Sequence, residues 1–301
     1  MPARTTDEIR SVNVRYHDAA AADHDAKWGI SYGALGRAQV LGKLAKALGS
    51  PPPHVERSLE VGSGTGYYTL HLARAGLVAQ PVATDISRGM LDALERSAAG
   101  LGVAVATARC DAAELPFDDR SFDLVLGHAV LHHLPDLDAA FREFARVLRP
   151  GGLLVFCGEP SRSGHRLAEI PKRAGLLAAP LWRRALRARP RAPDGHHHHG
   201  LEPLVDVHRF DPAELASYAT RAGLGAVRVS GDELVASWFG WLNRTLEASA
   251  DPATIPKRWY RFAQRGYLVL RETDERLLEP WLPAGVCYNL LLSARAPSAA
   301  P

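Results

Sequence analysis

The chain is poor in cysteine and lacks any long apolar run. Its 301 residues include three cysteines, which stand singly at Cys110, Cys157 and Cys287 in or beside apolar segments. An odd and scattered set of this kind indicates reduced core thiols and not a disulfide framework. No segment approaches the roughly 20 apolar residues of a membrane-spanning helix, and the first residues lack the apolar core of a signal peptide. We therefore expect a cytoplasmic protein without a transmembrane segment.

The net excess of positive charge comes from one segment of the chain. The net charge is +3, yet seven basic residues and no acidic one lie between Pro171 and Pro193. They are Lys172, Arg173, Arg183, Arg184, Arg187, Arg189 and Arg191. Without this segment the chain would be acidic, so its composition does not indicate a general nucleic-acid binder. The arginines beside Leu181 and Trp182 leave open a peripheral contact with anionic lipid.

The stretch from Ser58 to Ala73, SLEVGSGTGYYTLHLA, combines a strand, a glycine turn and a helix. Leu59 and Val61 predict a short buried strand, and the apolar residues near its end predict the first turns of a helix. Between them, three alternating glycines permit a sharp turn and the close approach of a ligand. The amino terminus of the helix offers free N–H groups to a polar ligand. We interpret the stretch as a ligand-binding loop.

The spacing of the glycines excludes two common nucleotide-binding motifs. A dinucleotide-binding loop needs Gly-x-Gly-x-x-Gly, but the third glycine position falls on Tyr67. A phosphate-binding P-loop needs a lysine, which this stretch does not have. The residues instead follow the pattern Glu60-x-Gly62-x-Gly64-x-Gly66. This pattern resembles the first motif of the class I S-adenosylmethionine-dependent methyltransferases.

Later segments resemble further motifs of the same family, in the same order. Four more strands are predicted at 82–85, 103–108, 122–126 and 153–157. The segments LPFDDRSFDLVLGHAVLHHLPD and EFARVLRPGGLLVF closely resemble the later methyltransferase motifs. The resemblance extends from Ser58 to Glu159, and four spaced motifs occur in the expected order.

The resemblance implies a Rossmann-like α/β fold with a seven-stranded methyltransferase sheet. The sheet would be mostly parallel with an antiparallel last strand, and segments 226–229 and 287–294 would supply its sixth and seventh strands. A helical cap would come from insertions. In such folds the ligand lies at the carboxyl ends of the strands. Five candidate residues follow strands and would share that edge: Gly62, Asp85, Asp111, His128 and Glu159.

The resemblance implies S-adenosylmethionine as the cofactor and a role for each loop. The loop around the amino-acid arm of the cofactor would comprise Glu60, Gly62, Ser63, Gly64, Thr65 and Gly66. Asp85 would accept hydrogen bonds from both ribose hydroxyls, and Ile86 would supply an apolar face for the adenine. Asp111 would accept from the adenine amino group, while the Ala112 N–H meets a ring nitrogen. His128 would lie nearer the methionine arm.

Two of these residues also have simpler interpretations. Asp85 is suited to be the N-cap of a helix that starts near Arg88, although its spacing from the glycine loop favours ribose binding. Asp111 has the character of an ordinary turn residue.

Candidates for a general base follow strands at the same sheet edge. They are His132, His133 and Glu159. Histidine titrates near neutral pH, so it can take a proton from a phenol or a sugar hydroxyl. The alternative is that a histidine in this position only caps backbone groups. The adjacent His196–His199 cannot all face one ion without an irregular backbone, so we interpret them as a loop and predict no metal site.

These patterns divide the chain into five parts. Residues 1–50 would form a helical segment over the cofactor site, and 51–160 the cofactor-binding half of the core. The basic insertion spans 161–207, with a possible helix at 176–188. The segments 208–232 and 285–297 would complete the sheet, and Asp211-Pro212-Ala213-Glu214 is a strong helix start. The insertion 233–284 holds four of the six tryptophans.

The aromatic insertion predicts two amphipathic helices, at 234–246 and 259–281. One interpretation is that these helices only pack on the core and on each other. The other is that some of their aromatic side chains form a lid that faces the substrate. With the motifs, this favours methyl transfer to a small, partly apolar acceptor such as a secondary metabolite or a lipid. The alternatives are a nucleic-acid methyltransferase, or a membrane-surface or binding protein that retains the fold. Oxygen, nitrogen and carbon acceptors all share this frame.

Overall fold

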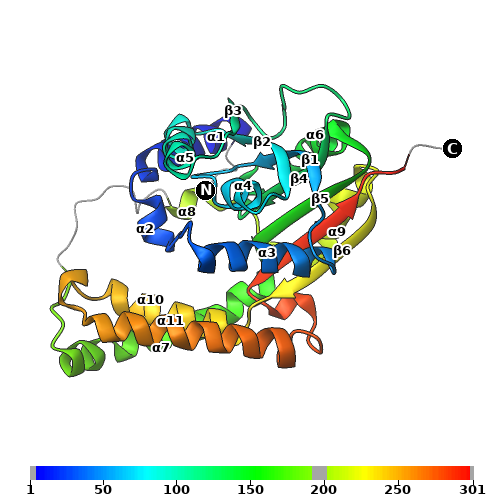
Figure 1. Ribbon diagram of the computed structural model, residues 1–301. Coiled ribbons are helices and arrows are strands. Elements are labelled where there is room, and N and C mark those ends of the chain that lie inside the picture. Colours follow the sequence, from blue (N-terminus) through cyan, green and yellow to red (C-terminus); the bar gives the residue numbers. More distant parts are fainter. Residues whose placement is uncertain (1–4, 192–201, 299–301) are drawn as a thin grey trace. The chain divides into compact units, whose positions relative to one another are not determined.

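The computed structural model describes residues 5–191 and 202–298. Within them the strands form a seven-stranded sheet in the order β3-β2-β1-β4-β5-β7-β6 (Figure 1). The strands are β1 (Val55–Val61), β2 (Val78–Asp85), β3 (Ala106–Arg109), β4 (Phe122–His128), β5 (Leu148–Pro160), β6 (Gly225–Asp232) and β7 (Asn289–Arg295). The strands from β3 to β5 in this order pair in parallel. β7 runs antiparallel to β5, because Gly152 O accepts from Ala296 N while Ala296 O accepts from Gly151 N.

The predicted Rossmann-like methyltransferase sheet with an antiparallel last strand is therefore confirmed. The chain divides into two compact units. The sheet unit comprises residues 1–159, 197–230 and 291–301, and the helical unit comprises 160–196 and 231–290. Helices of the sheet unit are α1 (Thr6–Ala20), α2 (His24–Trp28), α3 (Ala34–Leu48), α4 (Tyr67–Arg74), α5 (Arg88–Leu101), α6 (Leu137–Val147), α8 (Glu202–Val205) and α9 (Pro212–Arg221). Those of the helical unit are α7 (Arg162–Leu186), α10 (Val235–Ala248) and α11 (Lys257–Thr273).

Polar residues at the helix starts explain where the helices of the sheet unit begin. The Ser87 hydroxyl accepts from Met90 N at 3.1 Å and caps α5. The capping box predicted at Asp211 is present at the start of α9, with Pro212 as the first helical residue. Such caps satisfy N–H groups that have no partner inside the helix.

The core of the sheet unit lies on both faces of the sheet. On one face, Leu44 of α3 and Tyr68 of α4 pack with Leu126 and Val155 in a buried cluster. Successive strand residues point to opposite faces, so Phe156 faces the other side, where its ring lies 5.1 Å from that of Phe144 in α6. Burial of these side chains, at roughly 25 cal/mol per Å² of apolar area, holds the parallel strands in register. The register in turn fixes which loops meet at the carboxyl edge.

The helical unit differs from the sequence-based expectation in its first helix. We predicted a helix only at 176–188, but α7 runs from Arg162 to Leu186 and contains Pro171 and Pro180. The helix starts early because the Ser161 hydroxyl accepts from Gly164 N at 2.9 Å. Each proline removes one helical hydrogen bond. Packing of α7 on α10 offsets this loss; Gly175 admits Thr245 of α10, whose Cβ would lie 2.9 Å from an added methyl group.

A buried carboxylate fixes the start of α10. The Asp274 side chain is fully buried and accepts from the backbone N–H groups of Leu234, Val235 and Ala236 at 2.9, 3.0 and 2.8 Å. These are orphan donors of the first helical turn, where negative charge is favourable. Asp274 itself opens a short π-helical turn, Asp274–Leu278, after α11. The predicted second amphipathic helix, 259–281, therefore ends as an α-helix at Thr273.

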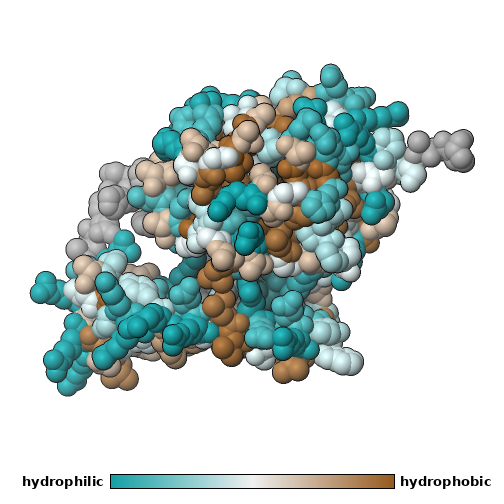
Figure 2. Space-filling view, in the orientation of Figure 1, coloured by the Kyte–Doolittle hydropathy of each residue, from teal (hydrophilic) through white to brown (hydrophobic). Residues whose placement is uncertain are grey.

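The helical unit carries apolar side chains at its surface. Leu177 of α7, Trp281 and Leu277 are more than half exposed, and hydrophobic residues reach the surface among hydrophilic ones (Figure 2). Of the helices in the described residues, none is both long and apolar enough to cross a bilayer. The histidines at 196–199, which we interpreted as a loop, lie outside the described residues.

Candidate functional site

The glycine loop connects β1 to α4 in a conformation that requires glycine. Gly62, Gly64 and Gly66 have φ angles of +60°, +52° and +85°, which other L-residues rarely adopt. A methyl group on Gly62 would lie 2.2 Å from Val130 Cγ2, whereas one on Gly64 would have only His24 within 4 Å. The loop is thus packed on one side and open near Gly64. This arrangement can cradle a ligand that approaches the backbone closely.

Glu60 lies at the end of β1, beneath this loop. Its side chain is buried and accepts from Thr69 N in the first turn of α4 at 2.7 Å. Burial raises the pKa of Glu60 to about 7, and the charge of Asp85 adds to the effect, although the hydrogen bonds from Thr69 oppose it. A buried carboxyl group with a raised pKa is a site at which a cationic or hydrogen-bond-donating ligand is favoured.

Asp85 ends β2 beside the same loop. One carboxylate oxygen accepts from Gly64 N at 2.9 Å and the other from Ser87 N at 2.8 Å. Because Ser87, not Asp85, is the N-cap of α5, the N-cap interpretation of Asp85 is wrong. Burial raises the pKa of Asp85 to about 6, although these backbone hydrogen bonds lower it. Ile86 follows, half-buried, and its carbonyl accepts from the Arg109 side chain at 2.9 Å.

Asp111 and Ala112 follow β3. One oxygen of Asp111 accepts from Ala113 N at 2.7 Å, which is typical of a turn residue. The other lies 2.5 Å from Nε of Arg10 in α1. Ala112 is buried. The turn and the ion pair hold Asp111 at the same sheet edge as Asp85.

Helices α1 and α2 and the segment after them contact these loops through side chains that we did not identify from the sequence, although we placed residues 1–50 over the cofactor site. The Asp18 carboxylate accepts from the Ser87 hydroxyl at 2.5 Å and from Gly89 N at 2.9 Å. Asp25 accepts from the Thr65 hydroxyl at 2.6 Å, and the Tyr32 hydroxyl donates to the Thr65 carbonyl at 2.7 Å. Acidic residues on the first helices were the available signal, but acids on a helix surface are too common to be distinctive.

A histidine and a buried glutamate are joined where β4 and β5 end. Glu159 is fully buried; one oxygen accepts from Val130 N and Leu131 N, both at 3.0 Å. The other accepts from His132 N at 3.1 Å and lies 2.8 Å from His132 Nδ1. Burial opposes the charged imidazolium, but the hydrogen bond and charge of Glu159, with Asp206 further away, raise the pKa of His132. The pair leaves Nε2 of His132 facing away from Glu159.

His133 completes the 3₁₀ turn Leu131–His133 and has a different environment. Its Nδ1 lies 3.0 Å from the Val205 carbonyl, and its ring lies 5.4 Å from that of His17 in α1. Burial, followed by the charges of His132 and His17, lowers its pKa well below the usual value. Burial thus disfavours the protonated form of His133, whereas the hydrogen bond and charge of Glu159 favour that of His132.

His128 stands at the end of β4, on the side of the glycine loop. Its ring stacks on that of Tyr68 in α4, with centroids 4.8 Å apart and planes inclined by 23°. A methyl group on Gly158 would lie 2.8 Å from its Nε2. Packing of this kind fixes the orientation of the imidazole. The predicted site residues from all five loops thus meet at one edge of the sheet.

The residues at this edge suit S-adenosylmethionine, which has an ammonium group, a carboxylate, two ribose hydroxyls and an adenine. Glu60 and Asp85 are buried carboxyl groups that favour donors. Within the described chain, the buried Ser63 hydroxyl has no hydrogen-bond partner, so the glycine loop has an unused polar group. The open side of Gly64 leaves space for a ligand against the backbone.

Comparisons with known proteins identify the family to which the chain belongs. Residues 59–156 match the family described as Methyltransferase domain. The chain is 37% identical over 175 residues to demethylmenaquinone methyltransferase of Mycobacterium marinum, covering 58% of this chain and 69% of that protein. It is 35% identical over 175 residues to the same enzyme of Mycobacterium tuberculosis, covering 58% and 68%.

Solved structures resemble the fold as a whole. The [4+2]-cyclase SpnF aligns with a TM-score of 0.60 and 19% identity, covering 99% of both chains. Phosphoethanolamine N-methyltransferase 2 of Haemonchus contortus, in complex with S-adenosyl-L-methionine, aligns with a TM-score of 0.55 and 17% identity, covering 86% of this chain and 52% of that one. At such identities the likeness concerns the fold alone. Fold, site and curated relatives together show that the chain belongs to the class I S-adenosylmethionine-dependent methyltransferases.

Proposed function

We propose that the enzyme transfers a methyl group from S-adenosylmethionine to a quinol-type, partly apolar small molecule, with His132 as the general base. The acceptor class is inferred from the relatives named demethylmenaquinone methyltransferase, of which the chain covers 69% and 68%. The single structural observation that carries the mechanism is the pairing of His132 Nδ1 with the fully buried Glu159 at 2.8 Å. A nucleic-acid acceptor has no comparable support.

The glycine loop and its neighbours would hold the cofactor. Glu60 would lie on the side of its ammonium group, and Gly62, Ser63, Gly64, Thr65 and Gly66 would surround the amino-acid arm. Asp85 would accept from the ribose hydroxyls, since each carboxylate oxygen has a lone pair beyond the one that its backbone N–H occupies. Asp111 and Ala112 would hydrogen-bond the adenine, and Ile86 would pack on its apolar face. His128 would lie near the methionine arm. The bound cofactor supplies an electrophilic methyl group on a positively charged sulfur.

His132 would remove the proton that makes the acceptor nucleophilic. With Nδ1–H donated to Glu159, the lone pair of His132 lies on Nε2. It takes the proton of an acceptor hydroxyl, and the oxygen–hydrogen electron pair stays on the acceptor. The deprotonated acceptor would then be the nucleophile for the methyl group that the bound cofactor supplies. Where the methyl group goes to a ring carbon, the proton of that carbon is lost afterwards and the aromatic ring is restored. Glu159 is a positioning residue that orients the imidazole and balances its positive charge.

His133 is less suited to this role. Its Nδ1 is occupied by the Val205 carbonyl, and its lowered pKa makes it a weaker base. We propose that it shapes the pocket next to His132. For the remaining segments, our proposals stay those of the sequence: residues 1–50 cover the cofactor, and the insertion 233–284 provides an aromatic lid over the acceptor. The apolar and basic surface of α7, within 161–207, could serve peripheral contact with a lipid.

The proposal is tested by supplying demethylmenaquinol and cofactor with a radiolabelled methyl group to the purified enzyme. We expect labelled product with the wild type, a fall in kcat of about 10²-fold or more for His132→Gln, and a raised KM for the cofactor with Asp85→Asn. His54→Gln, which changes an exposed histidine, serves as the matched control and should change neither. Cofactor binding without labelled quinol would contradict the acceptor class. An unchanged kcat in His132→Gln would contradict the base.

A further inference from the structure

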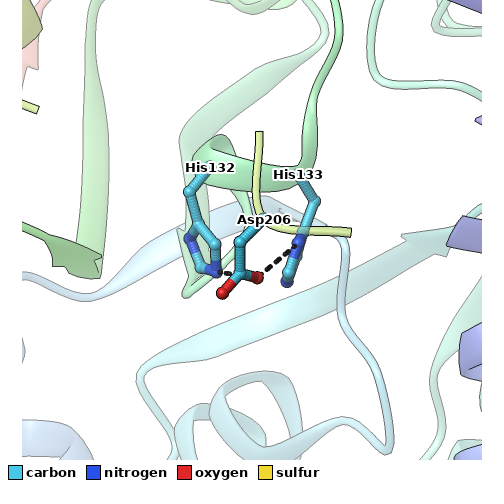
Figure 3. A group of neighbouring side chains, drawn as sticks. All are labelled: His132, His133 and Asp206. Atoms are coloured by element: carbon cyan, nitrogen blue, oxygen red, sulfur yellow. Dashed lines mark ion pairs between the residues drawn. The ribbon is translucent and has the colours of Figure 1, made fainter. Parts of the chain in front are cut away.

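Two histidines and an aspartate of the sheet unit converge at the edge of the site (Figure 3). His132, His133 and Asp206 each offer a ligand atom, and these atoms all lie within 4.8 Å of one another. Asp206 Oδ1 lies 3.7 Å from His132 Nε2 and 3.4 Å from His133 Nδ1. Ligand atoms about 2.0–2.2 Å from a tetrahedral zinc ion are themselves about 3.3 Å apart. The 3.7 Å between Asp206 Oδ1 and His132 Nε2 is close to this value. On His133 the 3.4 Å distance is to Nδ1, which also faces the Val205 carbonyl, so the ion would be bound by Nε2 of that ring.

We propose that His132, His133 and Asp206 bind one divalent transition-metal ion of the Zn²⁺ class. Two imidazoles and one carboxylate favour Zn²⁺, Co²⁺ or Fe²⁺ over Mg²⁺ and Ca²⁺, which prefer oxygen ligands. Three protein ligands leave at least one position for water or another molecule.

Groups behind both histidines orient them as metal ligands. Glu159 accepts from His132 Nδ1 at 2.8 Å, which directs the lone pair of Nε2 toward Asp206. The Val205 carbonyl lies 3.0 Å from His133 Nδ1; a proton on that atom would serve the carbonyl and leave the lone pair on Nε2. Metal-binding histidines typically donate their other ring nitrogen to a carboxylate or a carbonyl in this way.

The backbone holds the third ligand against the first two. The His132 carbonyl accepts from Val207 N at 2.9 Å and from His208 N at 3.2 Å, on the residues that directly follow Asp206. Nε2 of His208 also lies 2.9 Å from the Leu134 carbonyl. The segment after α8 is thus fastened to the 3₁₀ turn from which the two histidines project. The ligands come from two distant parts of the chain but share one rigid support.

Charge and access also suit a dication. The carboxylates of Asp206 and of the buried Glu159 supply two negative charges, which match the charge of the ion. His132 is buried, whereas the side chain of Asp206 is 46% exposed, so the ion has a path from solvent past the aspartate.

Occupation of the site has a consequence that rests on the proposed function. The ion takes the Nε2 lone pair of His132, which is the pair that would accept the proton of the acceptor. Metal binding and base catalysis therefore exclude each other, and Zn²⁺ should inhibit methyl transfer while leaving binding of S-adenosylmethionine unchanged.

The test is a Co²⁺ titration of the full chain after removal of metal, followed by its visible absorption spectrum. Because the consecutive His196–His199 can themselves bind such ions, all variants carry glutamine at these four positions. We expect one Co²⁺ per chain with intense absorption bands of a four- or five-coordinate ion, displaced by Zn²⁺. Asp206→Asn and His133→Gln should weaken binding at least tenfold, whereas the matched control His54→Gln should not. Equal Co²⁺ binding with and without Asp206→Asn, both in the chain with glutamine at 196–199, would overturn the site.

The spectrum separates this inference from the proposed function. The result of the Co²⁺ titration does not depend on whether the enzyme methylates demethylmenaquinol. If the spectrum identifies the site, equimolar Zn²⁺ should lower the rate of methylation tenfold or more with whichever substrate the enzyme methylates. A chelator should restore that rate. Binding of Zn²⁺ without loss of methylation would overturn the claim that ion and base share His132.

Discussion

Replacing Glu60 by glutamine should stabilise the cofactor-free protein and weaken its hold on the cofactor. Burial raises the pKa of Glu60 from 4.5 to about 7. At about 1.4 kcal/mol for each tenfold change in proton affinity, the ionised carboxylate costs the folded state about 3 kcal/mol. The glutamine oxygen can still accept from Thr69 N, which lies 2.7 Å from the glutamate oxygen. The substitution therefore removes the charge and keeps the hydrogen bond.

The pH dependence gives this prediction its sign. Because the folded-state pKa of Glu60 is raised, the folded protein holds the proton more tightly than the unfolded chain does. The stability that this provides is complete below pH 4.5 and is lost as the pH rises through about 7. Thermal unfolding of the cofactor-free protein at pH 5 and pH 8 measures the effect. The two proteins should differ little at pH 5, and Glu60→Gln should melt several degrees higher at pH 8.

Cofactor binding should respond in the opposite direction. If Glu60 meets the ammonium group, Glu60→Gln should raise the Kd for S-adenosylmethionine at least tenfold at pH 8. Calorimetry in two buffers of different ionisation enthalpy should show proton release by the wild type near pH 7 and less by the variant. Glu56→Gln, which changes an exposed carboxylate on the same strand, is the matched control. A variant with the same stability gap from wild type at pH 5 and pH 8 would refute the reasoning.

Two further substitutions test the loop and the helical unit. Gly62→Ala should lower the free energy of unfolding by about 2–4 kcal/mol and impair cofactor binding, because the left-handed backbone is strained and the new methyl group lies 2.2 Å from Val130. The control Gly76→Ala has the same kind of backbone strain, with φ +69°, but open space around the added methyl group. It should lower the free energy of unfolding by only about 1–2 kcal/mol. Equal losses in the two melting curves would argue against a packed loop. Asp274→Asn should weaken the cap on α10 and lower the free energy of unfolding by about 2–3 kcal/mol. Limited proteolysis should then cut the variant first within 231–290, while its affinity for the cofactor is unchanged. A cleavage pattern equal to that of the wild type would contradict the role of the cap.

The sheet and the positions of its loops could be predicted because their signals are local. β1 and β2 contain short apolar runs that end beside a glycine, Gly62, or at an acid, Asp85, and the parallel order then brings the loops to one edge. The capping box at Asp211 was equally visible. In these segments the residues that determine the structure are neighbours in the sequence.

The rest depended on contacts between distant segments. Arg10 lies beside Asp111, and Asp206 beside His132, because the fold brings distant segments together. Neither Arg10 nor Asp206 belongs to a recognisable sequence pattern. The full length of α7 was missed because proline argues against a helix interior, whereas packing on α10 outweighs that penalty. Propensity is a weak guide wherever tertiary contacts supply more free energy than the local preference opposes.

The cap on α10 also has a consequence for synthesis of the chain. The carboxylate of Asp274 accepts from Ala236 N, which lies 38 residues earlier in the chain. Helix α10 also packs on α7, and a stretch of the sheet unit separates these two helices in the sequence. A ribosome therefore releases the first turn of α10 well before the acid that completes it. The helical unit can reach its final structure only when the chain is almost finished. Nascent chains that stop before residue 274 should accordingly be recognised by cellular proteases as incomplete.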